Sequence, residues 1–138
     1  MKKVVRYLSF FVVVVIFIYI GIKIADYPLF RINKYEKLNL PLLSTKVIKW
    51  NENWTFMGDG QNEVLLKIDK NNFEKIKSVS ANISLKDIDI YTLNQMGIKP
   101  QQVWIYSKYT AIIKTKDSYF LYYYYCYPEF YNKNILVD

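Results

Sequence analysis

The carboxylate of Glu52 is the most chemically suggestive single group in the sequence. It lies between Trp50 and Trp54, and in an extended strand all three side chains point to one face. A carboxyl group held against indole rings has a raised pKa and can act as an acid. A hydrolase that uses Glu52 is therefore one reading, although glycosidase-type chemistry needs a second carboxylate at a fixed distance. The alternative is a bulge or an edge position that directs Glu52 to solvent.

The segment Gly58-Asp59-Gly60 is the most motif-like feature of the chain. A phosphate-binding loop would lead into the N-terminus of a helix, and a calcium loop needs several closely spaced acidic oxygens. Here the segment separates two alternating stretches, and only Asp59 and Glu63 are acidic. Glycines that accept positive φ favour a hairpin turn, and Asp59 is kept as a secondary site candidate beside Glu52.

The composition excludes several kinds of catalytic site. The sequence contains no histidine and a single cysteine, Cys126. Ser-His-Asp and Cys-His catalysis, histidine-containing zinc sites and an internal disulfide are therefore excluded. We expect a protein that is not an enzyme, with no catalytic residues, no cofactor and no metal ion.

The stretch SYFLYYYYCYP, residues 118–128, could instead provide a contact surface. In a strand, its odd-numbered and even-numbered residues point to opposite faces, and neither set is charged. A sheet with one solvated face normally alternates apolar with charged residues. Either both faces are covered, or one presents phenol rings to solvent, which tyrosine tolerates well. In the second case the candidate partner-binding surface is Tyr119, Tyr123, Tyr125 and Tyr127.

Alternation of apolar and polar residues predicts the strands that would position these groups. The predicted strands are residues 48–56, 64–68, 103–106, 109–114 and 119–127. Helical spacing appears twice, in residues 69–80, where Asn71 and Glu74 have the spacing of a capping box, and in residues 84–97, which end at Gly97. This order predicts an α+β domain over residues 46–138. Its antiparallel sheet of 4–5 strands would be covered on one face by one or two short helices.

The first 25 residues predict a transmembrane signal anchor. Residues 8–22 carry no charge and are preceded by Lys2, Lys3 and Arg6, which approaches the length that a bilayer requires. A cleaved signal peptide is the alternative, but its cleavage site would need a small residue where Lys23 stands. Residues 26–45 then predict a juxtamembrane linker.

The positive charge concentrates around this N-terminal segment. The formal net charge is +7, and residues 1–38 hold seven Lys and Arg against two acids. Cations beside an apolar segment indicate lipid headgroups as partners, and the rest of the chain shows no basic patch for nucleic acid. The predicted localisation is the cell membrane, single-pass, with a cytoplasmic N-terminus and an extracytoplasmic domain.

The motif W-x-F-x-G-D-G, from Trp54 to Gly60, is followed by an apolar strand and by Phe73 in a short helix. Over residues 47–80 the chain resembles small uncharacterised bacterial membrane-anchored envelope proteins that carry this hairpin. The resemblance implies a bacterial cell-envelope protein and supports the hairpin. It assigns no functional residue.

These observations together predict a non-catalytic, membrane-anchored binding or interaction module of the bacterial cell envelope. An immunity or inhibitor-type protein that binds a partner protein is one version of this hypothesis. A structural subunit of an envelope or secretion complex is the first alternative, and the hydrolase that uses Glu52 is the second.

Overall fold

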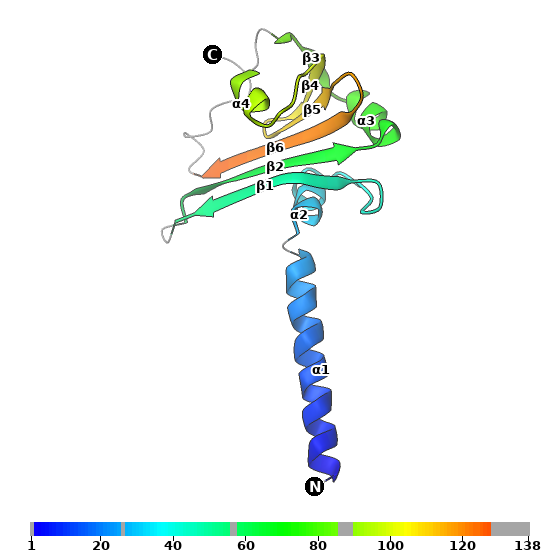
Figure 1. The fold of residues 1–138 in the computed structure, drawn as a ribbon, viewed down its shortest axis with the longest axis vertical. Coiled ribbons are helices and arrows are strands. Elements are labelled where there is room, and N and C mark those ends of the chain that lie inside the picture. Colours follow the sequence, from blue (N-terminus) through cyan, green and yellow to red (C-terminus); the bar gives the residue numbers. More distant parts are fainter. Residues whose placement is uncertain (1, 26, 56–57, 86–89, 128–138) are drawn as a thin grey trace.

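One antiparallel sheet of six strands forms the centre of the folded domain (Figure 1). The computed structural model describes residues 2–25, 27–55, 58–85 and 90–127. Along the sheet the strand order is β1-β2-β6-β5-β4-β3. The strands are β1 (Lys46–Trp54), β2 (Gly60–Ile68), β3 (Ala81–Ile83), β4 (Gln102–Ser107), β5 (Thr110–Lys114) and β6 (Tyr119–Tyr127). The helices are α1 (Lys2–Ala25), α2 (Pro28–Tyr35), α3 (Lys70–Lys77) and α4 (Ile90–Gln95).

The domain is α+β, but its sheet has six strands where the sequence predicts 4–5. The additional strand is β3, which pairs antiparallel with β4. With three residues, Ala81–Ile83, it is too short to show an alternating pattern. A strand of this length is recognised through its pairing partner and not through its own sequence.

The β1–β2 hairpin forms at the predicted turn. Trp54 pairs with Gly60, and the Thr55 N–H donates to the Asp59 carbonyl over 2.6 Å. Gly58 has a φ of +86°, a backbone conformation that a residue with a side chain rarely adopts. The hairpin prediction is thereby confirmed, while Phe56, assigned to the first strand, lies outside the described residues.

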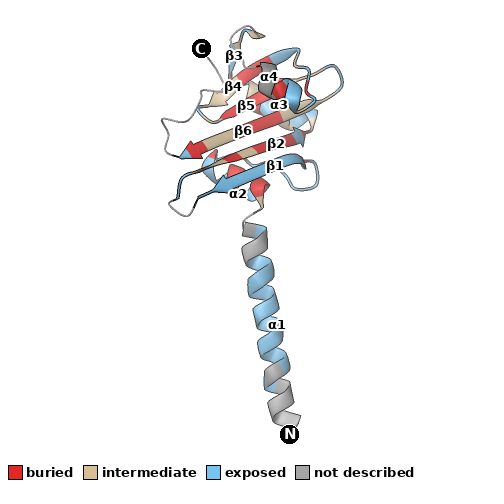
Figure 2. Cartoon of the chain, turned by 60° about the vertical axis from the view of Figure 1, so that its left-hand side comes forward, coloured by how far each residue is buried: buried red, intermediate tan, exposed pale blue. Residues whose placement is uncertain are grey.

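Strand β1 lies at the edge of the sheet and is largely exposed, in contrast to the half-buried strand that its alternation predicts (Figure 2). Trp50 and Trp54 remain 43% and 39% exposed. Because β1 pairs only with β2, no neighbour covers its outer side, and a register shift between Val47 and Lys49 interrupts its alternation. Alternation in the sequence does not distinguish an edge strand from an interior one.

Both faces of the sheet are covered, so the prediction that helices cover one face is wrong. One core cluster contains buried side chains of α2 and α3, and the other contains Leu93 of α4. The faces divide by residue parity, with Leu121 and Tyr123 of β6 in the first cluster and Tyr122 in the second. Strands β2, β5 and β6 are consequently the most buried part of the fold (Figure 2).

The caps of α3 and α4 follow from local sequence. The side chain of Asp69 accepts a hydrogen bond of 2.8 Å from the Asn72 N–H and caps α3. The predicted cap, Asn71, is instead inside the helix, because Asp69 offers an acceptor at the same three-residue spacing. Gly97, with a φ of +71°, follows α4 as predicted. Residues 86–89, where the second helix was expected to begin, lie outside the described residues.

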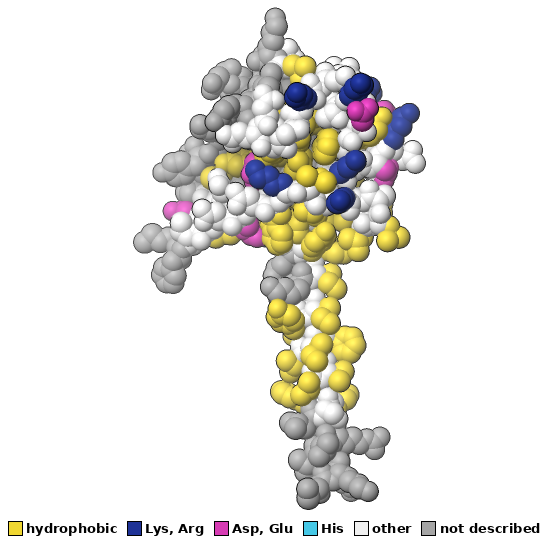
Figure 3. All heavy atoms as spheres, in the orientation of Figure 1, with side chains coloured by type: hydrophobic (Ala, Val, Ile, Leu, Met, Phe, Trp, Pro, Cys, Tyr) yellow, Lys and Arg dark blue, Asp and Glu magenta, His cyan; other side chains and the backbone are white. Residues whose placement is uncertain are grey.

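Helix α1 projects from the domain, and its described side chains are exposed and, apart from Ser9, apolar or aromatic (Figures 1 and 3). Within the residues that the structure describes, no helix is sufficiently long and apolar to span a membrane. The predicted transmembrane signal anchor, and with it the single-pass membrane topology, is therefore corrected.

Residues 26–45, expected to form a linker, contribute to the core of the domain. Leu29 and Ile32 of α2, and Leu38 and Leu40 after it, are buried in the first core cluster. Pro28 occupies the first turn of α2, where its missing N–H costs no hydrogen bond. Helix α2, held in place by these buried side chains, forms one wall of the pocket described next.

Candidate functional site

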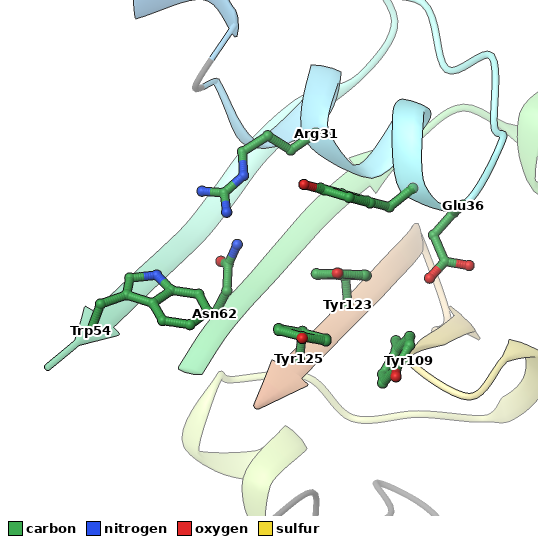
Figure 4. A pocket seen from close by; sticks show the side chains of 8 residues that line it. Arg31, Glu36, Trp54, Asn62, Tyr109, Tyr123 and Tyr125 are labelled. Atoms are coloured by element: carbon green, nitrogen blue, oxygen red, sulfur yellow. The ribbon is translucent and has the colours of Figure 1, made fainter. Parts of the chain in front are cut away.

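A pocket of about 450 Å³ lies between α2 and one end of the sheet (Figure 4). Five of its lining residues are aromatic, and three are polar or charged. The lining residues are Arg31, Tyr35, Glu36, Trp54, Asn62, Tyr109, Tyr123 and Tyr125. This volume and this mixture of a mainly aromatic lining with a few polar groups are typical of small-molecule sites.

Strand register brings the sheet residues of the pocket together. Asn62 pairs with Glu52 on one side and with Tyr125 on the other. Tyr123 lies two residues from Tyr125 on β6, so both side chains point to the same face. Trp54 ends β1 two residues beyond Glu52 and points to this face as well. Residues far apart in the chain therefore share one end of the sheet.

Helix α2 is fixed above this end of the sheet by its core residues and by hydrogen bonds that follow it. The Tyr106 hydroxyl donates to the backbone carbonyl of Glu36 over 3.1 Å. The Asn33 amide donates to the Leu40 carbonyl and accepts from the Leu40 N–H, both over 2.9 Å. These contacts hold the end of α2 against the domain, so the wall of the pocket that α2 provides is formed without a ligand.

Three tyrosine rings and one indole form a connected aromatic set in the pocket. The Tyr109 and Tyr125 ring centroids are 5.3 Å apart with ring planes at 70°. Tyr109 and Tyr123 are 6.5 Å apart at 60°, and Trp54 lies 6.4 Å from Tyr125. Such angled contacts are favourable between aromatic rings. The Tyr109 ring is turned against the rings of Tyr123 and Tyr125, which lie edge-on beside each other in Figure 4.

Arg31 and Glu52 form an ion pair at the edge of the pocket. Arg31 Nη1 lies 2.7 Å from Glu52 Oε1, and the Trp54 indole Nε1–H donates to the same oxygen over 2.6 Å. Desolvation lowers the pKa of Arg31, but the hydrogen bond and the charge of Glu52 outweigh it and raise that pKa overall. Glu52 therefore holds both the guanidinium and the indole in position.

Two further polar groups, Asn62 and Glu36, line the pocket. Asn62 is 4% exposed, and its Oδ1 atom has no hydrogen-bond partner among the residues that the structure describes. Glu36 is 9% exposed, and none of the described ion pairs includes its carboxylate. A buried polar atom without a partner is rare in folded proteins, because leaving it unsatisfied costs about 1–3 kcal/mol. Both groups extend into the pocket (Figure 4).

The pKa of Tyr123 predicts a specific pH dependence of stability. Burial, followed by the negative charge of Glu36, raises the pKa of this phenol above its ordinary value of 10.0. The folded state then keeps the phenol proton at pH values at which the unfolded chain loses it. The stabilisation is fully present below about pH 10 and is lost as the pH rises toward the folded pKa. We expect the free energy of unfolding to fall more steeply with pH in the wild type than in Tyr123→Phe. Urea unfolding at intervals from about pH 9 to about pH 11 measures the difference, and parallel curves would contradict it.

The structure separates the residues of the predicted tyrosine surface. Tyr123 and Tyr125 line the pocket. Tyr119 packs on Phe73 of α3, with ring centroids 4.6 Å apart. Tyr127 is 50% exposed at the end of β6. These four residues do not form one bare row, because α2 and α3 cover different parts of the same sheet face.

The two acidic candidates occupy different surroundings. Glu52 lies beside the pocket, engaged by Arg31 and Trp54. Asp59 is exposed in the hairpin turn, where its backbone carbonyl accepts a hydrogen bond. Among the described residues, no group of three Cys, Asp or Glu side chains could hold a metal ion.

Sequence reasoning did not identify five of the pocket residues, which are Arg31, Tyr35, Glu36, Asn62 and Tyr109. The first three follow from the existence of α2. A signal for that helix was present, because Pro28 suits a first helical turn and Leu29 and Ile32 have helical spacing. For Asn62 and Tyr109 the sequence offers no such signal, since their role depends on strand pairing.

Comparison of the chain with protein-family models, with curated proteins and with solved structures gives no match.

Proposed function

We propose that this protein is a non-catalytic binding module that takes a small ligand into the aromatic pocket beneath α2. The observation that carries the proposal is the unpartnered Oδ1 atom of Asn62, buried in a pocket with five aromatic lining residues. A ligand that donates a hydrogen bond to this oxygen would remove the cost of leaving it unsatisfied. Ring faces around it would supply apolar contact area.

The geometry supports binding rather than catalysis by Glu52. Its Oε1 atom already accepts from Arg31 and from the Trp54 indole. The pocket walls are also fixed in advance by ring contacts and by the anchored helix α2. A pre-formed site loses little conformational entropy on binding, which favours affinity. The predicted interaction surface is thus replaced by a concave site that contains two of its four tyrosines.

The proposal is tested by a fragment screen on the full-length protein labelled with ¹⁵N-tryptophan. Trp54 lines the pocket, whereas Trp50 lies on the same strand with similar exposure and does not line it. We expect some fragments to shift the Trp54 indole resonance saturably while the Trp50 resonance stays in place. The variant Trp54→Phe assigns the responding resonance by removing it.

Two results would contradict the proposal. If no fragment moves Trp54 more than Trp50, the pocket is not a ligand site. The fragments' own proton spectra are recorded after prolonged incubation with the protein. If the wild type converts a fragment chemically and Glu52→Gln does not, the protein is catalytic. The proposal that it is a non-catalytic module is then wrong.

A further inference from the structure

We infer that the ligand of this pocket is a compact organic cation of the alkylammonium or quaternary ammonium class. The inference rests on the binding function proposed above and adds the chemical class of the ligand. Three independent properties of the pocket carry it: the arrangement of its rings, the balance of its charges and the unpartnered oxygen of Asn62.

The ring arrangement suits a cation. The face of an aromatic ring is the negative end of its quadrupole, and cations bind within about 6 Å of the ring centroid. The Tyr109 ring meets that of Tyr123 at 60° and that of Tyr125 at 70°, and Trp54 lies at 38° to Tyr125. Ring faces that meet at such angles can contact a rounded cation from more than one side. The described residues already include such contacts, with Lys77 Nζ 5.0 Å from the Trp104 centroid and Lys108 Nζ 5.3 Å from the Tyr109 centroid.

The charges of the lining also favour a cation. Arg31 is the positive lining residue, and Glu52 already binds it at 2.7 Å. Glu36 is the negative one, and within the described residues it forms no ion pair. At Tyr123, which lies between them, the charge of Glu36 has a larger effect on the phenol pKa than the charge of Arg31. A buried charge without a partner is costly, and a bound cation would neutralise it.

The unpartnered atom of Asn62 is an acceptor. A carbonyl-type oxygen has no hydrogen to donate, so it is satisfied by an N–H group or by the positive surface of an ammonium ion. An anionic ligand would instead meet this oxygen and the Glu36 carboxylate with repulsion. Among the lining residues the positive group is the Arg31 guanidinium, and it is already bound to Glu52.

The inference is tested with choline and its neutral isostere 3,3-dimethylbutan-1-ol, which differ in charge and hardly in shape. Titration of the full-length protein is followed at the Trp54 indole resonance. We expect saturable binding of choline that is at least about tenfold tighter than that of the isostere. Acetate, which carries the opposite charge, should leave Trp54 unshifted.

Matched variants show which pocket residues the binding of choline depends on. Glu36→Gln should weaken the binding of choline about tenfold and leave the affinity for the neutral isostere unchanged. Tyr125→Leu should weaken choline binding about tenfold. Tyr127→Leu should not, because Tyr127 lies two residues further on β6 and does not line the pocket. Circular dichroism of each variant establishes that it is folded, and Tyr125→Leu keeps the test decisive if Glu36→Gln does not fold.

The outcomes separate this inference from the proposed function. Equal affinity for choline and its isostere, or preference for acetate, would overturn the cation inference while the pocket remains a ligand site. The cation inference is also overturned if other fragments shift the Trp54 resonance and ammonium compounds do not. If no compound of any class shifts Trp54, the binding function itself is overturned and the inference with it.

Discussion

Replacing Phe73 by alanine is expected to lower the free energy of unfolding by about 3–5 kcal/mol. Phe73 of α3 is fully buried. Its ring lies 5.4 Å from that of Trp104 in an edge-to-face contact and 4.6 Å from that of Tyr119. Truncation would remove these contacts and leave a cavity that rigid neighbours on β4 and β6 cannot fill. Urea unfolding with linear extrapolation measures the loss.

Two companion variants make this result interpretable. Val79→Ala, just after α3 at an exposed position, should change stability by less than about 0.5 kcal/mol. Phe73→Leu keeps most of the volume and should cost about 1.5 kcal/mol or less, which leaves a folded protein if the alanine variant does not fold. A loss below about 1 kcal/mol in Phe73→Ala would show that α3 does not pack on the sheet as described.

The elements that the sequence predicts well are those specified by local signals. Strand β6 has the predicted bounds, because Tyr119–Tyr127 lies between a polar turn and Pro128. Odd-numbered residues of β6 pack in the first core cluster and even-numbered ones in the second, as expected for side chains that alternate between two faces. The β1–β2 hairpin follows from its glycines. Each of these features depends on neighbouring residues, so a single sequence suffices to find it.

The features that the sequence does not predict depend on distant contacts. Trp50 and Trp54 alternate as residues of a half-buried strand do, but the sheet order leaves β1 at the edge. The apolar pattern of the N-terminal residues predicts a membrane anchor, which the described helix does not support. Tyrosines on β6 could be exposed or covered, and the choice depends on where α2 packs.

The pocket illustrates the same limit at the level of function. Its residues extend from Arg31 to Tyr125, and their proximity results from the pairing of β1, β2 and β6 together with the position of α2. The sequence does indicate chemically relevant groups, namely Glu52 and the tyrosines of β6. It does not indicate that Glu52 binds Arg31, nor that, among the described residues, Glu36 forms no ion pair and Asn62 Oδ1 has no hydrogen-bond partner. Those relations decide which ligand the site favours.

Replacing Gly60 by alanine is expected to destabilise the hairpin and alter the pocket in one step. Gly60 pairs with Trp54 across the turn. A Cβ atom at Gly60 would lie 2.6 Å from Trp54 Cε3 and 2.8 Å from Trp54 Cα, and it would also collide with the Asn53 carbonyl oxygen. Two of these three atoms belong to the backbone, so rotation of a side chain cannot relieve the overlap. We expect a loss of about 2–3 kcal/mol in urea unfolding, as for an overpacked site.

The same substitution should be visible at the site, which distinguishes it from a purely local loss of stability. Displacement of Trp54 would break the 2.6 Å hydrogen bond from its indole to Glu52. Glu52 would then be held by Arg31 alone, so the Trp54 indole resonance should shift even without ligand. Gly21→Ala in α1 is the matched control, because its added Cβ meets no atom within 4 Å beyond its own stretch of helix, and it should neither destabilise the protein nor shift the Trp54 resonance. Unchanged stability and an unshifted Trp54 resonance in Gly60→Ala would mean that the close approach of the two strands is absent in solution. The pocket would then lack the wall that Trp54 provides.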